Sequence, residues 1–143
     1  MKTTVVYARS HSVGGVWIRW HDNVAPGRWS HVGIVVGDQV IEARAFKGVT
    51  VGPLAEFTER YPKYEFVDHD VPMLSAGREW LLRQIGAKYD YLAIFGRLFR
   101  RSWQSEDRWH CQELVEGYLR AAGRQRFRDS PAHITPNLGY MVL

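Results

Sequence analysis

Three residue types in this chain could together form a nucleophilic active site: a cysteine, a histidine and a carboxylate. Cys111 is the only cysteine among 143 residues, and it stands in the string WHCQELVEGYLRAAG. His31 and Glu42 stand much earlier, in SHVGIVVGDQVIEA. In such sites a thiolate attacks a carbonyl, an imidazole moves the proton, and a polar group orients the imidazole. If the three converge, the chain is a cysteine hydrolase or acyltransferase; otherwise it is a small basic domain without this chemistry.

Cys111 by itself has three interpretations. It cannot form an internal disulfide, so it is a buried inert thiol, an incidental surface thiol or a nucleophile, and a lone cysteine is most often structural. The apolar spacing predicts a helix over 111–122 that Gly123 ends. A cysteine that begins a helix lies beside free N–H groups, which favour the thiolate and can stabilise an oxyanion. His110 is a rival base, but adjacent residues at a helix start point apart.

The segment 31–44 predicts a tight hairpin that brings a histidine and a carboxylate together. The turn Gly37-Asp38 suits a two-residue connection and places Gly33 opposite Glu42. His31 and Glu42 then share one face as diagonal neighbours, and Gly33 leaves room between them. A slip of one residue would put them on opposite faces. The other face is the predicted core side, with Val32, Ile34, Ile41 and Ala43.

The hairpin also has a plainer interpretation. His31 and Glu42 could be a surface pair on a half-exposed sheet. Arg44 could bind Glu42 as a simple salt bridge and leave His31 without an orienting partner. The catalytic interpretation therefore depends on Cys111 lying close to His31.

Length and composition bound the remaining possibilities. The 143 residues, with 45% hydrophobic residues, fit a single globular domain over 1–143. The net charge of +4 suits an anionic partner such as cell-wall polymer, phospholipid or nucleic acid, without choosing one. We expect no transmembrane segment and no signal peptide, because no apolar run is long enough and the N-terminus lacks a hydrophobic region. The sequence is silent on oligomeric state.

No cofactor is expected. The other histidines show no metal-ligand spacing, so a zinc site is a weak hypothesis and we expect no metal. Gly14-Gly15 lacks the pattern of a phosphate-binding loop. Six tryptophans accompany the arginines, but no nucleic-acid stacking motif is recognisable, so no specific nucleic-acid partner is expected.

The rest of the chain predicts an α+β fold, with a small antiparallel sheet followed by helices. Residues 12–20 are ambiguous, 21–29 read as a loop, and 102–110 as a polar connection. The expected strands are 3–9, 46–51 and 64–71, with an edge strand in the tail 131–143. The expected helices are 54–61 after Pro53, 75–86 with Ser75 as N-cap, and 90–99.

Three strings in this order resemble the circularly permuted branch of the NlpC-type papain-like cysteine peptidases, within the lecithin:retinol acyltransferase-like superfamily. They are SHVGIVVGDQVIEA, GAKYDY at 86–91 and CQELV at 111–115. The resemblance implies a papain-like fold with the nucleophile at a helix N-terminus. It assigns Cys111 as nucleophile, His31 as general base and Glu42 as orienting residue. Tyr89 and Gln112 would line the substrate or oxyanion site, although Gln112 replaces the serine that is frequent in the family.

The resemblance also implies a reaction class. The enzyme would cleave an amide bond, in a cell-wall peptide or similar substrate, through a thioester and without metal. Lipid deacylation or acyl transfer is the alternative within the superfamily, and a binding module with a basic surface is the non-enzymatic one. A cytoplasmic, phage-associated or otherwise exported location would fit.

Overall fold

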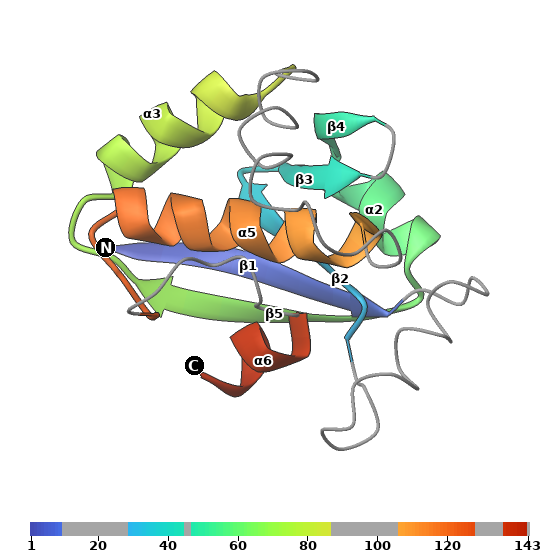
Figure 1. Cartoon of the computed structure of the whole chain (residues 1–143). Helices are drawn as coiled ribbons and strands as arrows, with labels where there is room; N and C mark the ends of the chain where they lie inside the picture. The colour runs from blue at the N-terminus through green and yellow to red at the C-terminus, as the bar shows by residue number, and fades with distance from the viewer. Residues whose placement is uncertain (10–28, 45–46, 87–105, 128–135, 143) are drawn as a thin grey trace.

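The computed structural model describes residues 1–9, 29–44, 47–86, 106–127 and 136–142 of the chain (Figure 1). They form an α+β fold, as the sequence pattern predicts, with five strands and four helices among the described residues. The strands are β1 (Lys2–Arg9), β2 (His31–Val36), β3 (Gln39–Arg44), β4 (Gly48–Pro53) and β5 (Lys63–Asp70). The helices are α2 (Leu54–Arg60), α3 (Leu74–Gln84), α5 (Glu106–Ala121) and α6 (Pro136–Met141).

The five strands form one antiparallel sheet in the order β4-β3-β2-β1-β5. The segment from β2 to β4 is a meander whose strands pair with their sequence neighbours. β5 returns to the other side of β1, so the first strand of the chain becomes an interior strand. An interior strand is buried on both faces and reads as an apolar run, which is what Val5, Val6 and Tyr7 provide.

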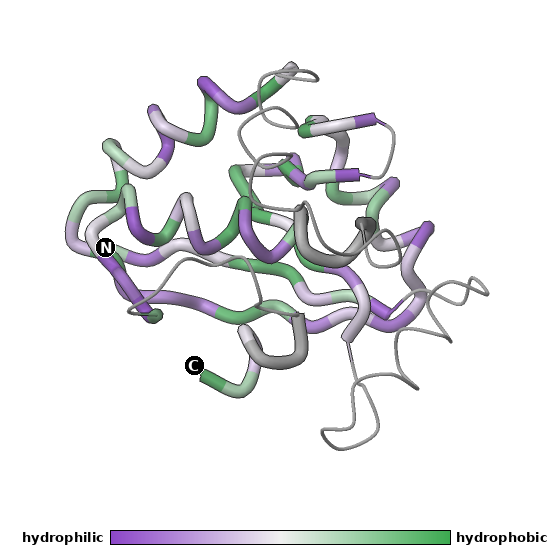
Figure 2. Tube along the Cα trace, viewed as in Figure 1, coloured by the Kyte–Doolittle hydropathy of each residue, from purple (hydrophilic) through white to green (hydrophobic). Residues whose placement is uncertain are grey.

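Both faces of the sheet are covered. One face packs on α5, with Val5, Ile34 and Leu114 in the same buried cluster. The opposite face carries a smaller cluster in which Val6 and Val40 surround Phe57 of α2. Figure 1 shows α5 passing in front of the sheet with α3 beside it, and in Figure 2 the middle of the sheet is largely hydrophobic. The site residues on β2 and β3 are therefore enclosed by helices on two sides.

The helix that carries Cys111 begins earlier than predicted. α5 starts at Glu106, so part of the predicted polar connection is helical and Cys111 lies in the second turn. The expectation of a nucleophile at the helix N-terminus is therefore wrong.

Two further local predictions are wrong. Ser75 is not an N-cap, because α3 starts at Leu74 after Met73 and no side chain caps it. The tail does not form an edge strand in its described part, where α6 is helical; Pro136 occupies a first helical position, which proline favours. The predicted loop at 21–29, except Trp29, and the predicted helix at 90–99 lie outside the described residues.

None of the helices that the structure describes has the length and apolar character required to cross a membrane.

Candidate active site

The β2–β3 hairpin has the predicted register. Val36 pairs with Gln39 and Ile34 with Ile41, on either side of the turn. Gly37 has a φ of +64°, which a two-residue hairpin turn requires and glycine adopts without strain. The register places His31 and Glu42 on the same face. The space that the sequence predicts at Gly33 is filled by Val40, because a Cβ on Gly33 would lie 2.6 Å from Val40 Cγ1.

His31 and Glu42 form a buried hydrogen-bonded pair. His31 Nε2 lies 2.5 Å from Glu42 Oε2, and both residues are more than nine-tenths buried. The plainer interpretation of a half-exposed surface pair is therefore wrong. The second oxygen of Glu42 accepts a hydrogen bond from Arg60 Nη1 at 2.7 Å, so the arginine that binds this carboxylate comes from α2 and is not Arg44.

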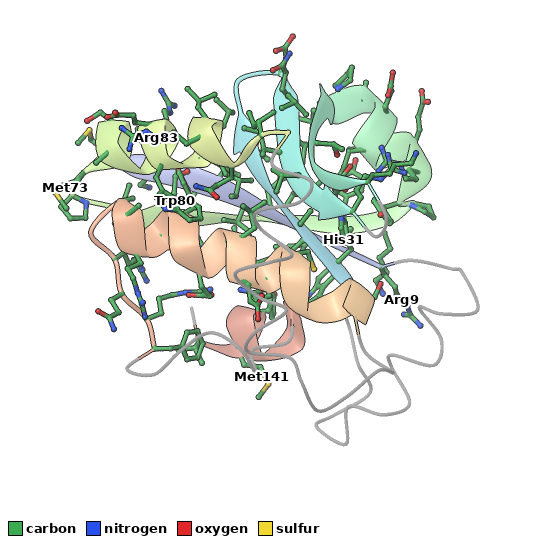
Figure 3. The ribbon with its side chains drawn as sticks, turned by 45° about the horizontal axis from the view of Figure 1, so that its top comes forward. Arg9, His31, Met73, Trp80, Arg83 and Met141 are labelled. Atoms are coloured by element: carbon green, nitrogen blue, oxygen red, sulfur yellow. The ribbon has the colours of Figure 1, made fainter. Side chains whose placement is uncertain are left out.

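The thiol of Cys111 is hydrogen-bonded to the imidazole of His31. Figure 3 labels His31 on β2, beside the N-terminal half of α5. Burial disfavours the imidazolium, but hydrogen bonds with Cys111 and Glu42 and the charge of Cys111 outweigh it and raise the pKa of His31 well above its usual value. Since Nε2 is bonded to Glu42, Nδ1 is the ring nitrogen left for the sulfur. The three residues thus form one chain from thiol to imidazole to carboxylate.

The charge state of Glu42 is set by its two cationic partners. Burial alone would raise the pKa of this carboxyl, but the hydrogen bonds and charges of His31 and Arg60 lower it below its ordinary value. Glu42 is therefore a carboxylate at neutral pH. A carboxylate in this position fixes the imidazole tautomer and stabilises the imidazolium.

Two aromatic rings of α2 and its C-terminal end cover the imidazole. The ring of Tyr61 stacks on His31 with centroids 5.1 Å apart, and that of Phe57 lies 6.0 Å away. The two rings also contact each other. This stacking and the hydrogen bonds with Glu42 and Cys111 leave His31 little freedom to rotate.

The position of Cys111 within α5 limits what its backbone can do. In an α-helix each N–H from the fifth residue onward donates to the carbonyl four residues earlier. A helix that begins at Glu106 therefore engages the N–H groups of Cys111 and Gln112. The macrodipole also acts mainly in the first turn. The expected oxyanion site at the helix start is thus not formed at Cys111, and the partner of its side chain is His31.

The structure gives the side chain of Gln112 a packing role. Its amide donates to Glu116 Oε1 at 2.7 Å, and Gly139 of α6 packs directly on it. Gln112 is fully buried in this arrangement, which does not support a contact with substrate. Tyr89 lies outside the described residues, and the side chain of His110 is likewise not described.

Glu113 is a buried acid that the sequence reasoning missed. It is only 1% exposed, and neither carboxyl oxygen has a hydrogen-bond partner among the described residues. Burial raises the pKa of Glu113 to about 8, so the group is mainly protonated at neutral pH. The signal available in the sequence was its place directly before the apolar residues Leu114 and Val115.

No group of three or more potential metal ligands occurs in the part of the chain that the structure describes. Comparison with known proteins adds no relative: no family model matches the chain, and no curated protein or solved structure matches it.

Proposed function

We propose that this protein is a cysteine hydrolase that cleaves an amide bond through a thioester intermediate. The single observation that supports it most is the buried chain from Cys111 through His31 to Glu42. A thiol, an imidazole and a carboxylate in this order are the parts of an activated sulfur nucleophile. They come from three elements, α5, β2 and β3, which the fold packs together.

The proposed reaction has two steps. In the first, the Cys111 thiolate attacks the carbonyl carbon, the C–S bond forms, and the C–N bond breaks as His31 gives its proton to the leaving amine. In the second, His31 takes a proton from water and the water oxygen attacks the thioester. The C–S bond then breaks, the acid leaves, and the Cys111 thiolate and protonated His31 are restored. Glu42 keeps the imidazole oriented in both steps. Tyr89 remains a candidate oxyanion donor.

The substrate class is proposed from the resemblance. The ordered strings around His31, Tyr89 and Cys111 favour a permuted papain-like, NlpC-type fold, and relatives of that kind act on cell-wall peptides. A peptide of this class, or a similar amide, is the proposed substrate. An ester or a lipid acyl group is the alternative for the same site, since a thioester can form from either.

A second candidate function is a binding module that keeps the fold without turnover. One observation favours it: Cys111 is 0% exposed and belongs to the main hydrophobic core. A sulfur in this position reacts only if the site opens. Structural buried cysteines are inert, whereas catalytic ones are partly accessible.

Thiol alkylation separates the two candidates. The native protein is incubated with iodoacetamide from pH 5 to 9, and modification of Cys111 is followed by intact mass. A hydrolase should be alkylated near pH 7, and His31→Ala should slow the reaction by at least about tenfold because the thiolate loses its counter-ion. His69→Asn is the matched control, since His69 is also buried but lies on β5. An alkylation rate unchanged by His31→Ala, or no alkylation before unfolding, would reject the hydrolase.

Substrate class is decided by direct cleavage. Peptidoglycan peptides and acylated lipids are incubated with the wild type and with Cys111→Ala. New amines from the peptides, only with the wild type, would support amide hydrolysis. Release of fatty acid alone would transfer the proposal to the lipid alternative.

A further inference from the structure

Four side chains, one of them the imidazole of His31, form a closed ring of contacts. His31 binds one oxygen of Glu42 at 2.5 Å, and Arg60 binds the other at 2.7 Å. The guanidinium of Arg60 lies over the ring of Tyr61, 5.5 Å from its centroid, and Tyr61 stacks on His31 at 5.1 Å. Each member therefore touches two others, and two of the four come from the end of α2.

The fold places α2 along the hairpin so that this ring can close. The first residue of α2, Leu54, donates its N–H to the carbonyl of Asp38 in the hairpin turn at 2.8 Å. Arg60, at the last position of the helix, then reaches Glu42 farther along the same hairpin. The helix is held at both ends, with Phe57 buried between them.

We propose that Arg60 is a positioning residue for the His31–Glu42 pair, which holds one carboxylate oxygen and shares the charge of that carboxylate with the imidazole. A role of Arg60 in catalysis rests on the proposed function, whereas its contacts with Glu42 and Tyr61 do not. A carboxylate that binds a single cation holds it more tightly than a carboxylate that two cations share. Arg60 thus limits how strongly Glu42 retains the proton on His31.

This limit matters because an imidazolium must give its proton to the leaving group. Acid–base catalysis is most efficient when the pKa of the group lies near the working pH. The pKa of His31 is already raised by Cys111 and Glu42, against the effect of burial. Among the described residues, the ionisable groups around His31 are Cys111 from α5, Glu42 from β3, Arg60 from α2 and Tyr61 directly after α2. Arg60 is the only permanent cation in that set.

The test is an NMR titration of the His31 imidazole in the full-length protein. In Arg60→Met we expect the titration midpoint of His31 to rise by about one pH unit, because a nearby positive charge is lost. Arg60→Lys keeps the charge and should leave the midpoint close to that of the wild type. Arg83→Met is the matched control, since Arg83 is an exposed arginine paired with Glu79 on α3, and it should not move the midpoint.

The outcomes separate this proposal from the proposed function. If the midpoint of His31 in Arg60→Met stays or falls, the shared-carboxylate role is wrong. Removing an arginine that only fastens α2 would loosen the site and lower the midpoint. Failure of Arg60→Lys to restore the midpoint would also overturn it. The titration needs no turnover, so an unreactive Cys111 would reject the hydrolase without affecting this result.

Discussion

Glu42 and Glu113 are both buried glutamates, yet their carboxyl groups have opposite character. Glu42 has a cation on each oxygen, and its pKa is lowered. Glu113 has no partner among the described residues, and burial raises its pKa to about 8. Their exposed fractions are nearly equal, at 4% and 1%. The difference shows that neighbours supplied by the fold, and not the degree of burial, decide whether an acid is ionised here.

The two environments have different origins. Glu42 lies on β3, where the neighbouring strand provides His31 and α2 provides Arg60. Glu113 lies on α5 one turn before Gly117, where the helix packs closely on Trp80 of α3. The first position is a polar junction between three elements, and the second adjoins a contact between two helices.

The largest effect should come from replacing Glu42 with an apolar residue of similar length. Glu42→Met leaves His31 and Arg60 without their shared anion, so we expect the free energy of unfolding to fall by about 3 kcal/mol at pH 7. Urea denaturation followed by circular dichroism measures it. A loss well under 1 kcal/mol would mean that the carboxylate does little to hold these cations.

The same substitution at Glu113 should have the opposite sign. Glu113→Met removes a buried carboxyl that has no hydrogen-bond partner among the described residues, and we expect the free energy of unfolding to rise by about 2 kcal/mol. Denaturation under the same conditions makes the comparison direct. Equal losses at both sites would show that Glu113 has a stabilising partner after all.

The pH dependence of stability should sharpen the comparison. The pKa of Glu113 is raised in the folded state, so its protonated carboxyl favours the folded state. This contribution to the free energy of unfolding is complete below pH 4.5, the pKa of the unfolded state, and is lost as the pH rises to about 8. The loss amounts to at most about 1.4 kcal/mol per pH unit. Subtracting the wild-type curve from that of Glu113→Gln isolates this contribution; a flat difference between pH 5 and 8 would contradict the raised pKa. Glu42 behaves in the opposite way, because its pKa is lowered in the folded state. Its carboxylate stabilises the fold at pH values above the pKa of the unfolded state, and this stabilisation is lost as the pH falls through the pKa of the folded state.

The smallest effect is expected at an exposed paired glutamate. Glu79 binds Arg83 on the surface of α3, and both side chains are more than 60% exposed. Glu79→Met should change the free energy of unfolding by about 0.3 kcal/mol, because solvent screens such pairs. A change as large as that for Glu42→Met would mean that burial does not account for the ranking.

Local patterns in the sequence were sufficient to predict the hairpin and the α+β fold. The turn Gly37-Asp38 and the alternation around it determine the register, and the register determines that His31 and Glu42 touch. These features depend on residues close together in the chain. The contact of Cys111 with His31 was inferred from residue chemistry and from the resemblance, since no spacing rule links α5 to β2.

The features that the sequence did not reveal depend on long-range packing. Arg60 was unrecognised because only the docking of α2 onto the hairpin brings it to Glu42. Glu113 was unrecognised because a charged residue on an amphipathic helix is ordinarily assigned to solvent. The start of α5 was misplaced for a different reason: the apolar spacing used to predict the helix begins only at Cys111, whereas the helix begins at Glu106.

The order of the strands has a consequence for how the molecule assembles. His31 and Glu42 are 11 residues apart in the sequence, so their hairpin needs only a short loop closure. The contact between Thr3 and Tyr118, which joins β1 to α5, spans 115 residues. Non-local contacts form more slowly than local ones, and a chain made on the ribosome emerges from its N-terminus. We therefore expect the His31–Glu42 pair to form before α5 brings Cys111 to it, so that the three side chains come together only in the finished fold.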